Sequence, residues 1–343
     1  MEFENIIFNA NNSPKGSIIK NKPFITYLIK VININYNVKG NDLQFPAPQP
    51  VSIEKKDFVK LEKYKYYTSL KLDGVRFILY FIKDRNGVNQ SILINRALNF
   101  YNINITAEQN IFNGTLLDGE VIFNNKTKRW DFVIHDALVL CGNKINKLTH
   151  SVRLNDTRYC IESFIVKEDK SSPNTLDLKV KDFYPFEEFN KFIVDVYNKS
   201  NNNDGIIFMP ENLPVISGTQ YSMLKWKPES KHTFDFLVKE YSSDMEAYVF
   251  NMGNLKIFAK IHGNTEHGEK FIKDTKKLNG YKNECIVECS FSNETQNFIP
   301  ILIRTDKTHP NSMRTIERTL FNINENIKIS DFMEIQQENK SEE

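Results

Sequence analysis

The residues with the clearest chemical potential lie in one short segment, residues 71–76, which reads Lys-Leu-Asp-Gly-Val-Arg. It stands between two runs, 64–70 and 77–82, that are rich in aromatic and β-branched residues, as buried strands are. Gly74 permits a tight turn or a close approach of the backbone. A lysine beside other cations can act as a nucleophile, because they disfavour its protonated form. The alternative is an ordinary hairpin turn with solvated charges.

Acidic residues beside glycine recur further along the chain. Residues 118–120 read Asp-Gly-Glu and residues 204–205 read Asp-Gly, and each leads into an apolar run. We predict a bend at a strand end in both places. Carboxylates at strand ends can bind a metal ion or sugar hydroxyls, because hard cations prefer oxygen ligands.

Basic residues interrupt other apolar runs. Arg96 ends a predicted strand, and the spacing of Lys225 and Lys227 puts both lysines on one face of another. Arg304 and Lys307 follow a later apolar run. Several cations of this kind can hold a triphosphate. A solvated surface alone does not explain why each charge interrupts an otherwise apolar strand.

The composition is that of an ordinary globular protein. The chain has 343 residues, of which 40% are hydrophobic and 26% charged, and this length suggests two or three domains. The formal net charge is only +2, so any contact with nucleic acid must be local. The cysteines show no disulfide framework, and the first residues form neither an apolar leader nor a membrane span. We therefore expect a reducing intracellular compartment, such as the cytoplasm, a viral factory, a virion or the nucleus, and no membrane.

The order of elements predicts a first domain at 1–231, a second at 232–311, and a C-terminal helix with a polar tail at 312–343 that can pack back on the first. Residues 1–50 and 99–109 are expected to be polar or connecting segments. The short strands expected after residue 232 suit a small barrel. These strands lie at 233–239, 246–250, 254–261, 284–290 and 299–304, a further strand is expected at 179–184, and helices are expected at 58–65, 149–166 and 186–199.

One apparent zinc site is weighed against a simpler interpretation. His262 and His267 precede Cys285 and Cys289, but both cysteines fall in a predicted strand. Four strand residues separate Cα atoms by about 13 Å, whereas two zinc-bound sulfurs lie only ~4 Å apart. We therefore favour two buried strand cysteines, and zinc would require the strand prediction to be wrong.

Taken in order, the charged motifs resemble those of the covalent nucleotidyltransferases, the superfamily of mRNA guanylyltransferases (capping enzymes) and ATP-dependent DNA and RNA ligases. The resemblance covers residues 60–311. The matching motifs are the Lys-x-Asp-Gly-x-Arg motif at 71–76, the acidic motif at 118–120, the aromatic-Asp strand at 132–140, and the segments 204–208, 224–228 and 304–311.

Two of these motifs resemble the capping branch more than the ligases. They are Lys-Trp-Lys-Pro at 225–228 and Arg-x-Asp-Lys at 304–307, the latter followed by Pro-Asn. One position departs from the family, because His135 stands where an aromatic residue is common before the Asp. A histidine can still stack on a purine. The heavy use of Asn, Lys and Ile resembles the compact capping enzymes of large DNA viruses.

The resemblance implies an α+β fold. It comprises a nucleotidyltransferase domain (ATP-grasp-like, of the ligase and capping type), built from antiparallel sheets with flanking helices, and a C-terminal OB-fold β-barrel. The implied activity is that of an mRNA guanylyltransferase, which transfers GMP from GTP through a covalent lysyl-GMP to the 5′-diphosphate end of RNA and so forms the GpppN cap. Two alternatives remain open: an ATP-dependent polynucleotide ligase and a non-catalytic RNA-binding relative.

The resemblance also implies a role for each matching residue. The nucleophile is Lys71, oriented by Asp73, and the ribose contacts are Arg76 and Glu120. The full catalytic set is Lys71, Lys225, Lys227, Arg304, Asp306 and Lys307. The GTP-binding set is Asp73, Gly74, Arg76, Arg96, Glu120, Phe132, His135 and Ile206, and the metal-associated carboxylate is Asp204.

The implied cofactor is Mg²⁺ or Mn²⁺, and the implied substrates are GTP and RNA with a 5′-diphosphate end. Capping also needs an RNA triphosphatase and a cap methyltransferase. The sequence has no alternating-glutamate strand for the first and no Gly-rich cofactor loop for the second. We therefore expect both as separate partners, and RNA polymerase as a further one.

Overall fold

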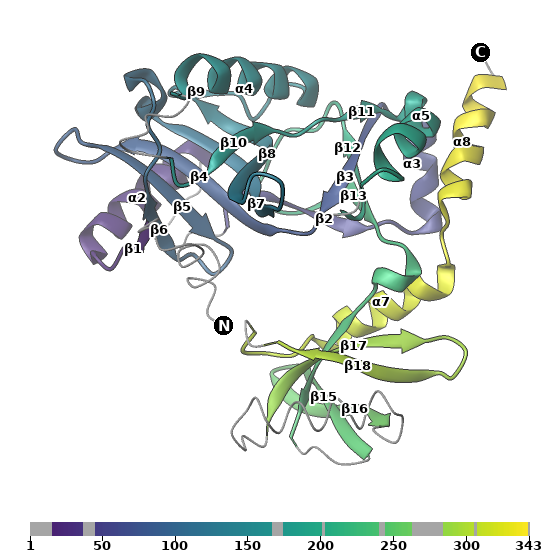
Figure 1. Ribbon diagram of the computed structural model, residues 1–343. Coiled ribbons are helices and arrows are strands. Elements are labelled where there is room, and N and C mark those ends of the chain that lie inside the picture. The colour runs from purple at the N-terminus through teal and green to yellow at the C-terminus, as the bar shows by residue number, and fades with distance from the viewer. Residues whose placement is uncertain are drawn as a thin grey trace. The chain divides into compact units, whose positions relative to one another are not determined.

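The computed structural model describes residues 16–36, 45–166, 174–200, 203–239, 244–262, 284–304 and 307–341. These residues form two compact units. The first contains the described chain up to Trp226 together with the C-terminal segment from Ile329, and the second contains Lys227–Lys328 (Figure 1). The chain therefore crosses between the units twice, after Trp226 and after Lys328.

The larger sheet of the first unit has eight strands. Its order is β1 (Gly16–Ile18), β6 (Phe100–Ile103), β5 (Asn89–Asn95), β4 (Val75–Lys83), β7 (Thr115–Asn124), β8 (Arg129–Leu140) and β10 (Asp177–Val180), with β9 (Asn143–Lys144) paired to β8. Neighbouring strands are antiparallel except β8 and β10, which run parallel.

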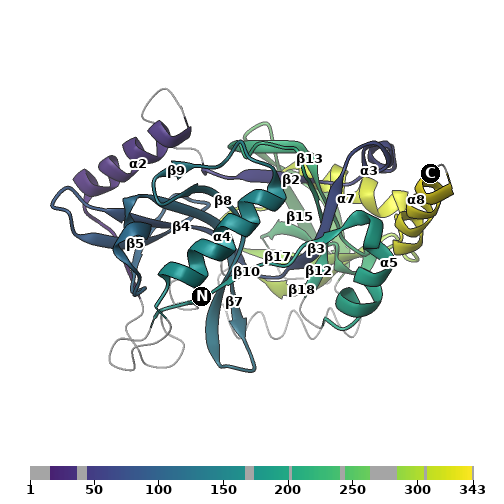
Figure 2. The ribbon, with the colours of Figure 1, turned by 90° about the horizontal axis from the view of Figure 1, so that it is seen from above.

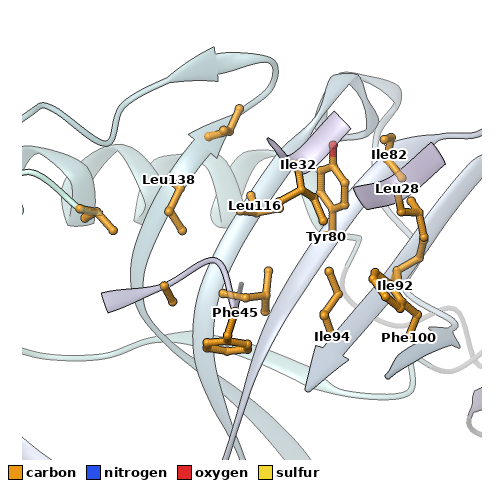
Figure 3. Packing of buried hydrophobic residues seen from close by; sticks show 14 residues of the cluster. Leu28, Ile32, Phe45, Tyr80, Ile82, Ile92, Ile94, Phe100, Leu116 and Leu138 are labelled. Atoms are coloured by element: carbon orange, nitrogen blue, oxygen red, sulfur yellow. The ribbon is translucent and has the colours of Figure 1, made fainter. Parts of the chain in front are cut away.

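Helices cover this sheet. Leu28 and Ile32 of α2 (Lys22–Tyr36) pack with Tyr80 of β4 in a cluster of buried side chains (Figure 3). α4 (His150–Phe164) contacts β8 and β10, and Figure 2 shows both helices against the sheet. Successive positions of β4 are buried, on both faces, which explains why this strand reads as a continuous apolar run.

The smaller sheet of the first unit has five strands. Its order is β11 (Tyr184–Pro185), β3 (Tyr66–Leu72), β12 (Asn203–Pro210), β13 (Gly218–Trp226) and β2 (Pro48–Ser52). α3 (Phe58–Lys63), α5 (Phe189–Phe192) and α8 (Ile329–Ser341) lie at one end of it (Figure 1). Phe332 of α8 is fully buried, with its ring centroid 4.9 Å from that of Phe208 and 5.9 Å from that of Trp226. The C-terminal helix is thus anchored in the aromatic core of the first unit.

Several element predictions for this unit need correction. α2 lies within 1–50 and β6 within 99–109, so neither segment is merely polar or connecting. Both depend for their burial on residues distant in the sequence. The strand expected at 179–184 divides into β10 and β11, which belong to different sheets. The helix expected at 186–199 is present as η3 (Phe186–Glu188), α5 and the π-helical η4 (Ile193–Tyr197).

The second unit contains one antiparallel sheet of five strands. Its order is β16 (Asn254–His262), β15 (Asp244–Asn251), β14 (Phe234–Val238), β17 (Cys285–Ser292) and β18 (Asn297–Ile303). All the strands predicted here are confirmed, and β17 contains Cys285 and Cys289 as expected. His267 lies outside the described residues. Within the described chain no ladder joins β16 to β18, so the expected closed barrel is not seen.

A helix covers the core of the second unit. The N-cap residue of α7 (Met313–Glu325) is Ser312, whose Oγ accepts a hydrogen bond from the Thr315 amide at 3.2 Å. Its Ile316 and Ile323 are buried in the cluster formed by the sheet. The α+β fold class with antiparallel sheets and flanking helices is confirmed. No described helix is both long and apolar enough to cross a bilayer.

Candidate active site

Lys71 lies where the chain passes from one sheet of the first unit to the other. β3 ends at Leu72 in the smaller sheet, and β4 begins at Val75 in the larger one. The two strands pair with different neighbours, so the hairpin alternative is wrong. This placement puts a lysine between two sheets, where residues from both can surround it.

The passage between the sheets depends on Gly74. A Cβ atom at this position would lie 2.4 Å from Cγ2 of Ile122 and 2.8 Å from the carbonyl oxygen of Val121. Real Cβ atoms do not approach other atoms so closely. Glycine is therefore needed here because the backbone passes directly against β7.

Lys71 forms an ion pair with Asp204 of β12. The register between the strands explains this partner. Asn203 pairs with Leu72 and Ile206 with Leu70, so Asp204 and Gly205 together lie opposite Lys71. Two residues opposite one define a β-bulge, and such bulges re-aim side chains. Gly205 has φ +134°, a conformation that favours glycine.

The first acidic residue of the motif lies elsewhere. Asp73 is exposed at the crossing, whereas the side chains of Lys71 and Asp204 are only 21% and 14% exposed. The carboxylate seen beside the lysine is thus the one assigned to a metal from the resemblance, and the orienting role expected for Asp73 remains a prediction.

A second charged group lies on the larger sheet, where Asp118 of β7 is fully buried. Asp118 accepts hydrogen bonds from Arg76 of β4, with Nε–Oδ1 at 2.9 Å and Nη2–Oδ2 at 2.5 Å. His135 Nε2 lies 3.2 Å from Asp118 Oδ1. Burial alone would raise the pKa of Asp118, but Arg76 and His135 outweigh it and hold the pKa well below its usual range.

The predicted bend at 118–120 is wrong, because β7 continues through it. The irregularity lies in the partner strand. Asp118 pairs with Asp136 and Gly119 with Ile134, so His135 is the extra residue of a bulge in β8. Gly119 is still required, since its Cβ would lie 2.7 Å from Cζ of Phe132. At both acidic motifs the local geometry is thus a β-bulge rather than the bend expected from the sequence, and the functional roles of these residues remain predictions.

The residues expected to contact the nucleotide differ in accessibility. Glu120 lies directly opposite Arg76 in the strand pair and is half-buried, which suits a shared ribose contact. Phe132 and Ile206, two of the expected base contacts, are fully buried in the core. His135 is half-buried and bonded to Asp118.

The other cations expected to contact phosphate, on the first unit and at the crossing out of it, are half-buried or exposed. Lys225 lies on β13, where it pairs with Ile207 of β12, the strand that carries Asp204. Lys227 follows at the crossing into the second unit. Arg96 is exposed, and its Nη2 donates to Gln49 Oε1 at 3.1 Å.

One buried cation was missed by the sequence analysis. Lys181 is only 8% exposed and lies between β10 and β11. Burial lowers its pKa to about 8; the carboxylate of Glu120 opposes this shift, and the charges of Lys71 and Arg76 add to it. Lys181 thus belongs to the same electrostatic cluster as Lys71. No motif singled it out, because it stands in a stretch of mixed charged and apolar residues, next to Asp182.

The cations of the 304–307 motif lie in the second unit. Arg304 Nη1 is 3.3 Å from Asp235 Oδ1 and 3.2 Å from Glu288 Oε2. Lys307 also forms an ion pair with Asp235. Asp306 lies outside the described residues. The sequence analysis did not single out either acidic partner.

The chain was compared with known proteins. The family model described as mRNA capping enzyme, catalytic domain, matches residues 19–229, and the model described as mRNA capping enzyme, C-terminal domain, matches residues 219–333.

Individual proteins give the same result. The mRNA-capping enzyme subunit alpha of Schizosaccharomyces pombe is 27% identical over 84% of this chain and 79% of its own length. The mRNA-capping enzyme of Danio rerio is 30% identical over 79% of this chain, which spans 46% of that protein. A solved structure, the ligase domain from M. tuberculosis LigD, aligns with 78% of this chain and 97% of its own at 13% identity, with a TM-score of only 0.36.

Together the site and the matches define a nucleotidyltransferase. A half-buried lysine with a carboxylate partner, surrounded by further cations, is suited to attack a phosphorus atom. The catalytic-domain match covers more than half of the chain. The chain belongs to the mRNA capping enzyme family.

Proposed function

We propose that Lys71 is the nucleophile of a two-step transfer of GMP from GTP to the 5′-diphosphate end of RNA. The family of the chain supports guanylyltransferase activity. The single observation that carries the assignment of the nucleophile is the position of Lys71. Its half-buried amine meets the carboxylate of Asp204 at the crossing between two sheets.

In the first step the free amine of Lys71 attacks the α-phosphorus of GTP. A P–N bond forms, the bond from phosphorus to the bridging oxygen of the β-phosphate breaks, and pyrophosphate leaves. Lys71 must lose a proton before the attack, because a protonated amine has no lone pair. The positive charges of Arg76 and Lys181 belong to the same cluster as Lys71 and stabilise the charged phosphoryl oxygens of the transition state.

In the second step an oxygen of the RNA 5′-diphosphate attacks the same phosphorus. The P–N bond breaks, Lys71 is regenerated, and the RNA receives GMP as a cap. Arg76 and Glu120 hold the ribose, Lys225 and Lys227 the α-phosphate, and Arg96 a further phosphate. The guanine lies against His135, which leaves Phe132 and Ile206 to support the pocket from the core. Asp73 and Gly74 shape the chain around the nucleophile.

The divalent metal on which such enzymes depend would be held by Asp204. Mg²⁺ is often bound by one or two carboxylates together with substrate phosphates, and a single half-buried carboxylate beside Lys71 fits that pattern. The ion, Mg²⁺ or Mn²⁺, would withdraw electron density from the α-phosphate. The described residues contain no cluster of three or more His, Cys, Asp or Glu side chains positioned around a metal.

Arg304 and Lys307 donate to the β- and γ-phosphates of GTP in the first step, and Asp306 is the acidic member of the same catalytic motif. We further propose that a separate RNA triphosphatase supplies the diphosphate RNA and that a separate methyltransferase acts on the product. RNA polymerase is a further proposed partner, and a viral origin is in keeping with the composition.

The proposal is tested by incubating the purified protein with divalent metal and α-labelled GTP or ATP, and then adding 5′-diphosphate RNA. We expect a covalent label from GTP and none from ATP. The label should then be transferred to RNA as a GpppN end. Labelling by ATP would instead support a polynucleotide ligase. RNA binding without a label from either nucleotide would support a non-catalytic relative.

A further inference from the structure

Two cysteine side chains of the first unit meet where β8 ends against α4. Cys141 directly follows the last residue of β8, and Cys160 lies near the C-terminal end of α4. Both are free thiols, and their sulfur atoms are 3.8 Å apart. Because the sulfurs of a disulfide are about 2 Å apart, these two would have to approach by only about 2 Å to form a bond.

A tight turn fixes the position of Cys141. Cys141 and Gly142 form the two-residue loop between the paired strands β8 and β9. Both residues have a positive φ, +48° and +85°, as in a type I′ turn. The Cys141 amide donates to Thr115 Oγ1 at 2.9 Å, and the Gly142 amide donates to the carbonyl oxygen of Gly114 at 2.7 Å. The backbone that carries the Cys141 thiol is therefore anchored at both residues of the turn.

Cysteine is an unfavourable residue for this turn. At φ +48° most side chains are strained, and the first position of a type I′ turn favours Asn, Asp or Gly. Asn-Gly would therefore form the turn better than Cys-Gly does. Residues held in such backbone conformations cluster at functional sites. Here the strained residue is the one whose thiol lies beside a second thiol, which points to a use for the sulfur.

The two thiols differ in accessibility. Cys141 is half-buried, whereas Cys160 is only 4% exposed and belongs to the buried face of α4. Burial raises the pKa of Cys160 to about 12, and the neighbouring Cys141 adds to this shift. Cys160 therefore stays protonated, and an oxidant from solution meets Cys141 first.

A metal ion is the other common partner of two adjacent thiols. Structural zinc takes four protein ligands. Among the residues that the structure describes, no group of three or more His, Cys, Asp or Glu side chains is placed to hold a metal. The pair of cysteines therefore favours chemistry between the two sulfurs over a zinc site.

We propose that a hydroperoxide converts Cys141 and Cys160 into a disulfide. The sulfur of Cys141 attacks the O–O bond and becomes a sulfenic acid, while the thiol proton leaves with the other oxygen as an alcohol, or as water from hydrogen peroxide. The sulfur of Cys160 then attacks the sulfenic sulfur. The S–S bond forms, the S–O bond breaks, and the hydroxyl leaves with the Cys160 proton as water. The two electrons that the thiols lose reduce the hydroperoxide.

The disulfide would join α4 to β8 at a second point. The two elements are already connected through Arg153 of α4, whose Nε and Nη2 donate to the carboxylate of Asp136 at 2.7 and 2.8 Å. Asp136 directly follows His135, the expected base contact, whereas Cys141 lies about 17 Å further along an extended strand. The new bond would therefore stabilise the first unit and leave the surroundings of His135 unchanged.

The test treats the purified protein with hydrogen peroxide and maps its cysteines by alkylation and mass spectrometry. We expect one disulfide, between Cys141 and Cys160, that dithiothreitol reverses, and free thiols at Cys285 and Cys289, which are too far apart along β17 to pair. The bond closes a loop of about 20 residues, so the thermal midpoint of the first unit should rise by about 5–10 °C. Labelling by GTP should keep its rate.

Cys141→Asn is the matched variant, because Asn suits the first position of a type I′ turn and carries no thiol. It should fold, form no disulfide, and gain no thermal stability from peroxide. Cys160→Ala keeps the thiol that reacts first, so a sulfenic acid should accumulate at Cys141 and be trapped by dimedone. Cys285→Ser, a change in the second unit, should still form the disulfide.

No disulfide in the oxidised wild type, or one that includes Cys285 or Cys289, would overturn the inference. An unchanged thermal midpoint after oxidation would contradict the stabilising role. Labelling that oxidation slows in the wild type but not in Cys141→Asn would show that the bond does alter the site. The proposed function fails separately, because a wild type that takes no label from GTP contradicts that function, whereas the disulfide and the thermal midpoint are measured without GTP.

Discussion

At the scale of single residues, the site places unlike charges at short range. Lys71 meets Asp204, and Arg76 meets Asp118 on the neighbouring sheet. Lys181 differs from both, because its buried ammonium lies among Glu120 and two other cations. A buried cation that is not fully compensated lowers stability, and such residues are retained where they act on a ligand.

Replacing Lys181 by Met should therefore stabilise the protein at pH 7. The folded chain releases the Lys181 proton at a pKa of about 8 rather than 10.5, so the wild type carries the full penalty below pH 8. We expect Lys181→Met to raise the free energy of unfolding by about 3 kcal/mol at pH 7 and to slow labelling by GTP.

The stability that Lys181→Met gains over the wild type should shrink as pH rises from 8 to 10.5. In that range the unfolded wild type binds more protons than the folded one, so the wild type itself becomes more stable as pH rises. Urea unfolding at pH 7 and pH 10 measures this. A gain that is equal at both pH values would show that it arises from packing rather than from charge.

Replacing Asp118 by Asn should destabilise the protein, because it leaves the buried guanidinium of Arg76 without its counter-charge. We expect a loss of about 3 kcal/mol in the free energy of unfolding, measured in urea at pH 7. Asp131→Asn is the control, since Asp131 is also buried but its partner Lys179 is half exposed. A loss of about 1 kcal/mol is expected there. Equal losses in the two variants would contradict this account.

At the scale of elements, irregular strands place the functional side chains. The bulge opposite Lys71 carries Asp204, and the bulge at His135 lies beside Asp118. These irregularities explain why the local geometry at the acidic motifs could not be predicted from the sequence. A bulge depends on the register of a partner strand, and Asp-Gly by itself is equally typical of a turn.

Gly74→Ala tests the close passage between the sheets. The new Cβ would meet Ile122 and the carbonyl oxygen of Val121. We therefore expect a loss of about 2 kcal/mol in the free energy of unfolding, as is typical of overpacking, and slower labelling by GTP. Adding Ile122→Ala to the Gly74→Ala variant should recover only part of the lost stability and labelling activity, because the carbonyl oxygen of Val121 stays in place. Full recovery, measured by labelling and urea unfolding, would show that the backbone contact is unimportant.

At the scale of the whole molecule, two crossings connect the units. Phe332 of α8 contacts Trp226, the last residue of the first unit before the first crossing, and α8 begins directly after the second. Trp226 also stands between Lys225 and Lys227. The C-terminal helix therefore supports β13, the strand that carries Lys225, for which we propose contact with the α-phosphate.

Phe332→Ala should remove this support. Phe332 is fully buried among aromatic rings, and we expect a loss of about 3–5 kcal/mol in the free energy of unfolding of the first unit. Phe321→Ala in α7 is the control, because Phe321 is 49% exposed and should cost less than about 1 kcal/mol. A loss in Phe332→Ala as small as that in Phe321→Ala, measured by thermal or urea unfolding, would mean that α8 does not stabilise the first unit.

Much of this molecule was predictable from its sequence, for reasons that differ between parts. The strands of the second unit are short runs rich in apolar residues, and the motif at 71–76 has an unusual combination of residue types. Helix α2 was missed because its burial depends on strands far along the chain, and strand β6 because one of its two partners is β1. Lys181 and Asp235 were missed because neither residue belongs to a recognisable motif. Their importance arises only from the residues that surround them.

The central claim is that Lys71 becomes covalently attached to GMP. The most direct measurement is mass spectrometry of the protein after incubation with GTP and Mg²⁺, with peptide mapping of the modified residue. We predict the mass of one GMP on Lys71, its removal by pyrophosphate, and no addition to Lys71→Arg. A GMP adduct that persists in Lys71→Arg, or maps to another residue, would contradict the account.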